Sequence, residues 1–335
     1  MKKLFTLALC ALFTAQTAEA KIWRVNNTVG ANADFNNLTS AITAASAGDT
    51  LHVEASSIDY GTLTLNKKLV IRGTGYFLSG TPSNPKTQHN KNTSYGGTIY
   101  CEAGSKGSVI EGLTLFSVYL RDSLITLQRN NINYTYLSDT RDVAGDTIRH
   151  NFLNGIYLNG GNFKTRGLFV YNNIFTGYIN LSQTANADGF AVHNTFLGNN
   201  TFKTNNFIYQ NNIFNVSDFG QYKQANTFLN NVSVDNNLPA GNGNITGASL
   251  ANLYVGGATG AGFSSDDRYR LKAGSPAIGA GVLNGVAVDC GAFGGPAPYV
   301  LSGMPQMPSI YDIVMPSQIN VGTTAVTVTV SAAAH

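Results

Sequence analysis

The densest group of side chains that could do chemistry lies near the middle of the chain. It consists of Asp139, Arg141, Asp142, Asp146, Arg149 and His150. Carboxylates supply the oxygen ligands that calcium prefers, although calcium takes about six of them and this stretch offers three aspartates. The arginine and histidine that follow could transfer a proton or hold an acidic group. A solvated polar loop without a ligand is the other reading of the same residues.

A repeated pattern runs through this part of the chain and must position these side chains. In each copy, an apolar residue and two variable residues precede an asparagine, and an apolar pair follows it. The recurring residues are Asn130, Asn151, Asn173, Asn194, Asn212 and Asn231, at steps of 21, 22, 21, 18 and 19 residues. A period near 20 with β-branched and aromatic runs, and without a long helical pattern, predicts a solenoid of stacked parallel strands.

The recurring asparagine has a physical role in such a solenoid. Its side-chain amide carries both a donor and an acceptor, so a stacked column can hydrogen-bond along the axis and satisfy the polar backbone of a bend. Asparagine also tolerates the left-handed conformation that bends require. We therefore expect a buried asparagine ladder. A disordered asparagine-rich tract is the alternative, and the in-phase recurrence of Ile, Val and Phe argues against it.

The period also relates side chains that are far apart in sequence. Lys164 and Arg166 follow the first group by about one turn, and His193 shares its phase with His150 to within a residue, two turns or roughly 10 Å away. With Tyr171, these side chains could form a face that binds an acidic or neutral sugar. Tyrosines that could stack on sugar rings are Tyr157, Tyr171, Tyr178 and Tyr209. We expect Tyr171 to be exposed and most phenylalanines to be core.

Composition and the first residues bound the class of protein. Of the 335 residues, 43% are hydrophobic and 12% are charged, with a formal net charge of +3, which argues against a nucleic-acid partner. Residues 1–20 have two lysines, a short apolar run and Ala18-Glu19-Ala20, which is typical of a secretory signal peptide cleaved before Lys21. No stretch is long enough to span a membrane. We expect a secreted or cell-surface protein.

The two cysteines that follow the signal peptide are Cys101 and Cys290. An extracellular pair would ordinarily predict a disulfide. In a solenoid of about 20 residues per turn, however, the two positions are roughly nine turns and about 40 Å apart. Bridged Cα atoms lie within about 7 Å, so we predict two buried free thiols.

The chain divides into four segments. After the signal peptide, residues 21–48 hold a short strand and a helix that caps the solenoid, with Asp34 as the expected N-cap and Gly48 just past its end. Residues 49–295 form the solenoid. Four prolines then begin a linker, and alternating valines and threonines from Val326 predict a short β tail, so residues 296–335 are a proline-rich linker and tail. The tail strand has no obvious partner in the sequence.

Two stretches carry a resemblance to a known family. They are Gly48-Asp49-Thr50-Leu51-His52-Val53 with Leu69-Val70-Ile71-Arg72-Gly73, and the closing segment Tyr269 to Gly281 with Asp289-Cys290-Gly291-Ala292-Phe293-Gly294. From about Asp34 to Phe293, the chain resembles secreted bacterial right-handed parallel β-helix proteins of the pectin-lyase-like group. The resemblance implies an all-β right-handed parallel β-helix. It does not imply one activity, because this fold carries lyases, hydrolases, esterases and adhesins.

The resemblance implies two enzymatic templates. The sequence lacks the ordered aspartate motifs of the polygalacturonase-like hydrolases, and we expect Asp266-Asp267 to be a surface turn. Lyases of the fold neutralise a uronate, often with calcium, and use a lysine or arginine to abstract a proton. On that template, Arg149 and His150 would be catalytic and Asp139, Asp142 and Asp146 would hold Ca²⁺. Tyr171, His193, Lys164 and Arg166 would bind substrate.

Three functions therefore remain open. The first is binding or presentation of an extracellular polysaccharide without catalysis, because a long sheet face suits an extended chain. The second is a calcium-dependent, pectate-like polysaccharide lyase. The third is an adhesin or assembly protein that uses the C-terminal tail to bind a protein partner.

Overall fold

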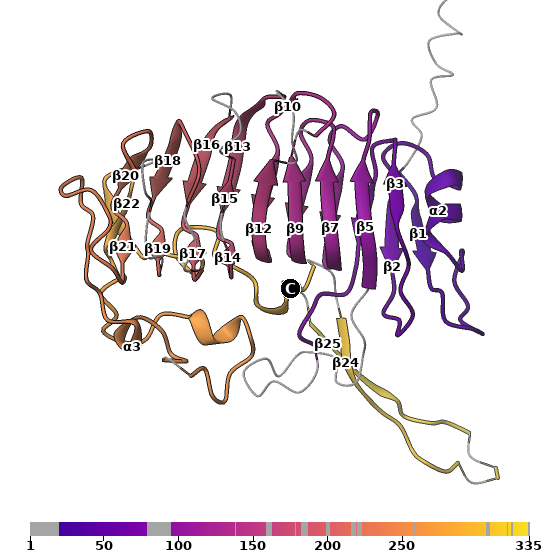
Figure 1. Cartoon of the computed structure of the whole chain (residues 1–335). Coiled ribbons are helices and arrows are strands. Elements are labelled where there is room, and N and C mark those ends of the chain that lie inside the picture. Colours follow the sequence, from indigo (N-terminus) through magenta and orange to yellow (C-terminus); the bar gives the residue numbers. More distant parts are fainter. Residues whose placement is uncertain are drawn as a thin grey trace, which may run out of the picture.

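The computed structural model describes residues 20–78, 95–137, 139–158, 163–177, 179–181, 187–198, 202–215, 219, 223–257, 259–305, 309–319, 321–322 and 324–333. The expected signal peptide, apart from Ala20, lies outside these residues, and so does Tyr178. Within the described residues, the chain is a right-handed parallel β-helix with about 21 residues per turn. The predicted fold class is therefore confirmed (Figure 1).

Two parallel sheets, which we call sheet A and sheet B, form the walls of the solenoid. Sheet A contains β1 (Ile22–Val25), β2 (Thr50–Val53), β4 (Val70–Arg72), β6 (Val109–Glu111), β8 (Thr126–Gln128), β11 (Thr147–Arg149), β13 (Thr165–Tyr171), β16 (Ala187–Val192), β18 (Phe207–Gln210) and β20 (Thr227–Leu229), with β10 (Val143–Ala144) beside β13. Sheet B contains β3 (Leu63–Leu65), β5 (Tyr95–Cys101), β7 (Thr114–Leu120), β9 (Asn131–Leu137), β12 (Phe152–Leu158), β14 (Ile174–Phe175), β17 (Thr195–Phe196), β19 (Ile213–Phe214) and β21 (Val232–Ser233), with β15 (Ile179–Asn180) beside β12. Successive turns add one strand to each sheet, so equivalent residues form columns along the axis.

The N-terminal end of the solenoid is covered by α2 (Leu38–Ala44), which confirms the predicted capping helix. The helix buries its own Leu38, Ala41 and Ile42 side chains. Its N-cap is Asn37, whose side chain accepts a hydrogen bond from the backbone N–H of Ser40, so the expectation of Asp34 was wrong. The Asp34 carboxylate instead accepts from the backbone N–H of Arg24.

The interior is filled by columns of apolar side chains from alternate strand positions. Towards the C-terminal turns the filling becomes aromatic, and the Phe175, Phe196 and Phe214 rings stack at 4.6 and 5.0 Å. Tyr209 is also fully buried and stacks on Phe228 at 5.1 Å. Of the 16 described phenylalanines, seven are buried, six are half-buried and three are exposed, so fewer are core than predicted.

The asparagine ladder is present and extends one residue beyond its prediction. From Asn151 on, each ladder side chain accepts from both the backbone N–H and the side-chain amide of the preceding member, at 2.7–3.1 Å. The last of these acceptors, Asn231, donates in turn to Asn244. The left-handed conformation belongs to the residue before each ladder asparagine. These residues are Arg129, His150, Asn172, His193, Asn211 and Asn230.

The chain returns along these bends after the last turn. Residues 289–304, here called the C-terminal strap, run back towards the N-terminal half of the solenoid (Figure 1). The Cys290 thiol donates to Asn230 O, the Asn172 amide donates to Ala292 O and Gly294 O, and Arg129 donates to Met304 O. The strap therefore seals the polar side of the bends over several turns.

A buried polar cluster holds the strap to the rest of the molecule. Asp266 is fully buried, and its carboxylate accepts hydrogen bonds from Ser264, Tyr299 and the backbone N–H of Ser302. The Tyr299 hydroxyl also bonds that of Tyr76. The expectation that Asp266-Asp267 is a surface turn was therefore wrong, because the returning strap covers it.

The remaining elements follow the last turn. They are α3 (Leu250–Leu253), the 3₁₀ helices Asp267–Tyr269 and Leu301–Gly303, the hairpin of β22 (Gly281–Leu283) and β23 (Val286–Val288), and the antiparallel hairpin of β24 (Ser309–Val314) and β25 (Thr329–Ala333). The predicted tail strand thus has a partner, β24. Cys101 and Cys290 are both free and buried, as predicted. None of the helices in the described residues is long and apolar enough to cross a membrane.

Candidate functional site

The three aspartates proposed as metal ligands do not converge. Asp139 is engaged by Arg121, whereas exposed Asp142 accepts from the backbone N–H of Lys164. Asp146 is buried and accepts from the backbone N–H of Ile125. Among the described residues, no group of three or more His, Cys, Asp or Glu side chains could hold a metal ion. Calcium binding stays a prediction.

His150 and His193 do share a column, but both lie beneath the C-terminal strap. The His150 ring nitrogen Nε2 bonds Ala297 O at 2.9 Å, and His193 lies against Gly294 and Gly295. Burial lowers the pKa of His150 to about 4 and also lowers that of His193. Both imidazoles are therefore neutral at neutral pH and are covered by protein.

Arg149 and Tyr171 are brought together on the outer face of sheet A. Arg149 donates to the Tyr171 hydroxyl at 2.8 Å and to Gln128 Oε1 at 2.7 Å. Gln128 and Arg72 both donate to Glu111, so one hydrogen-bonded row crosses five strands. Tyr171 is half-buried in this row rather than fully exposed.

Lys164 and Arg166 lie elsewhere on sheet A. Both are exposed at the beginning of β13, and Arg166 pairs with Asp188 at 2.7 Å. Arg166 is five residues before Tyr171 on this strand, a separation of roughly 17 Å. The structure therefore does not gather the predicted substrate-binding side chains into one site.

The outer face of sheet B carries an aromatic column that the sequence reading missed. Tyr100, Tyr119, Tyr136 and Tyr157 are directly paired on four adjacent strands. Their ring centroids are 4.8, 4.6 and 5.7 Å apart. The first three rings stack within about 26° of parallel and so form one continuous column along the solenoid axis. Together with Tyr134 and Phe116, we call this surface the tyrosine face.

The tyrosine face has an apolar side and a shallow groove. Phe116 is 60% exposed and meets the Tyr134 ring edge to face at 5.7 Å. A groove of about 350 Å³ runs beside it. Its lining includes the side chains of Asn133 and Asn154, which hydrogen-bond each other at 3.3 Å. An exposed ring beside amide groups is a suitable surface for a ligand with both apolar faces and hydroxyls.

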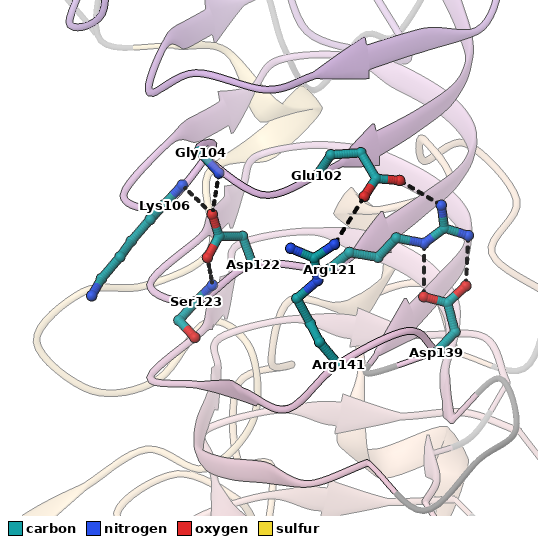
Figure 2. Close-up of polar contacts among 8 residues, drawn as sticks. All are labelled: Glu102, Gly104, Lys106, Arg121, Asp122, Ser123, Asp139 and Arg141. Atoms are coloured by element: carbon teal, nitrogen blue, oxygen red, sulfur yellow. Dashed lines mark hydrogen bonds and ion pairs between the residues drawn. The ribbon is translucent and has the colours of Figure 1, made fainter.

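A charged cluster, drawn in Figure 2, borders the tyrosine face, because its Arg121 guanidinium lies over the Tyr100 and Tyr119 rings. Arg121 follows β7 and forms a bidentate pair with Asp139 at 2.7 Å for both contacts, while a third nitrogen donates to Glu102 at 2.6 Å. Its guanidinium lies 4.7 Å from the centroid of the Tyr100 ring. The hydrogen bond with Asp139 is the main reason that the pKa of Arg121 is raised. This cluster fixes the ends of three strands.

Arg141 is the loosely held member of the charged cluster. Its side chain is 40% exposed, and it reaches Glu102 at 3.5 Å. Figure 2 shows it directed towards Glu102 alongside the Arg121 pair. An exposed arginine with one long contact can turn to an acidic or hydroxyl group of a ligand at little energetic cost.

The tyrosine face can donate hydrogen bonds at neutral pH. Burial is the main reason that the pKa values of Tyr119 and Tyr136 are raised, and the neighbouring tyrosines add to the effect. Both phenols therefore stay protonated and present O–H groups. Because the paired strands repeat about every 4.8 Å, these groups form a row parallel to the solenoid axis.

A signal for the tyrosine face does exist in the sequence. Tyr136 and Tyr157 each follow their ladder asparagine by six residues, and Tyr119 has the same offset from the phase-equivalent Leu113. Of the tyrosines proposed to stack on sugars, Tyr157 belongs to this face and Tyr209 is core. Asp139 is the predicted site residue that borders the face, through Arg121.

Comparisons with protein-family models and with curated protein sequences give no match to this chain.

Proposed function

We propose that this chain is a secreted β-helix protein of the pectin-lyase-like kind that binds an extended extracellular polysaccharide on the tyrosine face. The observation that carries the proposal is the in-register column of Tyr100, Tyr119, Tyr136 and Tyr157 on adjacent strands. A repeating row of hydroxyl donors matches a ligand whose hydroxyl groups also repeat along its length. No catalytic step is needed for this role.

The surroundings of the column support a polysaccharide ligand. Phe116 offers exposed aromatic surface to the apolar face of a sugar ring, and Asn133 and Asn154 offer amides in the groove beside it. Arg141 at the opposite side can bind an acidic substituent. Because the solenoid core is rigid, the ligand binds a surface that is already formed, which limits the entropy lost on binding.

The test is retention on immobilised polysaccharides. The purified protein is incubated with a panel of acidic and neutral polysaccharides, with and without calcium, and both retention and product masses are measured. Retention without products supports the proposal. Products lighter than hydrolysis products by one water would instead establish a lyase, because elimination adds no water to the broken bond, and would direct attention to Arg149 on sheet A.

Two matched variants locate the binding surface. Phe116→Ala removes the exposed ring of the tyrosine face, and Phe169→Ala removes an exposed ring from sheet A; the two side chains are 60% and 43% exposed. The proposal expects weaker retention for Phe116→Ala alone. Equal loss in both variants, or loss in Phe169→Ala alone, would contradict it.

A role in assembly is the second candidate, favoured by the β24–β25 hairpin. Ile313, Val314, Val328 and Val330 are all more than half exposed. A two-stranded hairpin with exposed valines is only marginally stable by itself, and it gains stability when another strand pairs with its edge. Deleting 309–335 tests this role, because the deletion spares the C-terminal strap; loss of protein-partner binding with unchanged polysaccharide retention would support it.

A further inference from the structure

The beginning of β1 is held by a buried carboxylate in an unusual way. Asp49, which directly precedes β2, is 5% exposed. One of its oxygens accepts from the backbone nitrogen of Lys21 at 2.9 Å. The other accepts from Trp23 Nε1 and from the backbone N–H of Ser46, both at 2.9 Å. The pKa of Asp49 is lowered because these hydrogen bonds, together with the nearby Lys21 charge, outweigh the effect of burial.

Asp49, Trp23 and Ser46 form a socket around the backbone nitrogen of Lys21. The Lys21 side-chain ammonium lies 3.3 Å from the centroid of the Trp23 ring. Trp23 is itself fixed by its bond to Asp49. Ala20 and Lys21 are both exposed. Ala20 is also the last residue of the small-x-small motif expected at a signal-peptide cleavage site.

We infer that Asp49 is the receptor for a new N-terminus that cleavage creates at Lys21, so that proteolytic maturation locks the first turn of the solenoid. Hydrolysis breaks the bond between the Ala20 carbonyl carbon and the Lys21 nitrogen. The hydroxyl of water goes to the Ala20 carbon and a hydrogen to the nitrogen, which takes a further proton from solvent at neutral pH. In the uncleaved chain the Lys21 nitrogen is an amide that donates to Asp49 at 2.9 Å. After cleavage the same nitrogen is an ammonium group with a positive charge.

The exchange of an amide for an ammonium strengthens the contact without moving the backbone. The amide already bonds a charged acceptor, and the ammonium adds a direct attraction between opposite charges, which the low exposure of Asp49 leaves weakly screened. The titratable groups that face Asp49 here are the Lys21 α-amino group and the Lys21 side-chain ammonium over Trp23. Pairing raises the pKa of the α-amino group, so its stabilising effect is present below its ordinary pKa of about 8 and is lost as pH rises through the raised value.

The experiment compares a chain that begins at Lys21 with one that begins at residue 19, each with and without Asp49→Asn. Thermal midpoints are measured at pH 7, and fluorescence of Trp23, the one tryptophan of the sequence, reports on the socket. The chain that begins at Lys21 is expected to melt at least about 2 °C higher. Asp49→Asn is expected to abolish that difference in thermal midpoint. Raising the pH above the raised pKa of the Lys21 α-amino group is expected to abolish it too.

Equal midpoints for the two chains, or the same difference in Asp49→Asn, would overturn the inference. If Asp49→Asn does not fold, Trp23→Phe serves instead, because it keeps the carboxylate and should keep the difference between the two chains. NMR titration of the Lys21 α-amino nitrogen must then give a pKa above 8. N-terminal sequencing of exported protein should begin at Lys21, and any other beginning would also overturn the inference.

Discussion

Asn173→Ala removes an interior member of the asparagine ladder and should be among the most destabilising single changes in this protein. Asn173 is fully buried. Its oxygen accepts from the backbone and side-chain nitrogens of Asn151 at 2.9 and 3.0 Å. Its amide donates to Ile148 O at 2.8 Å and to Asn194 Oδ1 at 3.0 Å. Alanine can make none of these bonds.

The magnitude follows from the groups that lose their partners. The backbone N–H of Asn151 and the carbonyl of Ile148 lose these bonds inside the solenoid. Each buried group left unsatisfied costs about 1–3 kcal/mol, so we expect a loss of about 3–5 kcal/mol in the free energy of unfolding. Asn244 accepts the equivalent pair of bonds from Asn231 at the open end of the ladder, where it is partly exposed. Water can replace it there, and Asn244→Ala should cost about 1 kcal/mol.

Urea unfolding followed by circular dichroism measures both variants. The prediction is a much lower midpoint for Asn173→Ala than for Asn244→Ala. If the two variants unfolded at the same midpoint, the ladder would not be satisfying the buried backbone of the bends, and the reasoning would fail.

Three further predictions concern buried groups. Burial raises the pKa of Asp146 to about 8, so the folded state holds a proton that the unfolded state has released between about pH 4 and pH 8. Stability should therefore fall as pH rises through that window, and Asp146→Asn should flatten the dependence of the thermal midpoint on pH; an unchanged slope would refute this. Asn172→Ala removes two bonds to the C-terminal strap and should speed proteolytic cutting within residues 291–298, whereas cutting at the wild-type rate would show that the strap is held otherwise. Cys101 and Cys290 should resist a thiol reagent in native protein and both react after denaturation, and an unreactive denatured protein would indicate a disulfide.

The repeating part of the fold could be predicted because its physical requirement repeats. Every bend that enters the core needs an internal hydrogen-bond partner for its backbone, and asparagine recurs where that need recurs. The two thiols are free as predicted, but not by counting turns: Cys101 ends β5, whereas Cys290 lies on the C-terminal strap and bonds Asn230 O near the last turn. The capping helix also followed from local spacing, although its N-cap did not, because Asn37 and Asp34 are equally suited to the position by residue type.

The C-terminal strap could not be predicted from the sequence. The chain returns along the solenoid only once, so no repeated pattern in the sequence marks the residues that the strap covers. His150 and His193 have the spacing of a shared polar face, and only the strap shows that they are covered. The prediction that Asp266 lies in a surface turn was wrong for the same reason, because the residue that covers and bonds it, Ser302, is on the strap.

The tyrosine face was only partly accessible to sequence reasoning. Tyr100, Tyr119 and Tyr136 precede most of the asparagine repeats from which the phase was taken, so Tyr157 was noticed and its column was not. The pairing of Arg121 with Asp139 joins two separate bends, and a list of charged residues along the chain does not show which bends lie side by side.

The central claim is that the row of phenolic hydroxyls on sheet B binds the polysaccharide. Calorimetric titration of wild-type protein and of Tyr119→Phe/Tyr136→Phe with the polysaccharide that is retained tests it directly, because phenylalanine keeps the stacked rings and removes only the hydroxyls. At about 0.5–1.5 kcal/mol for each hydrogen bond, the double variant should bind roughly 5- to 150-fold more weakly with an unchanged thermal midpoint. Tyr171→Phe on sheet A is the control and should bind as wild type does. Full affinity in the double variant, or an equal loss in the control, would contradict the account.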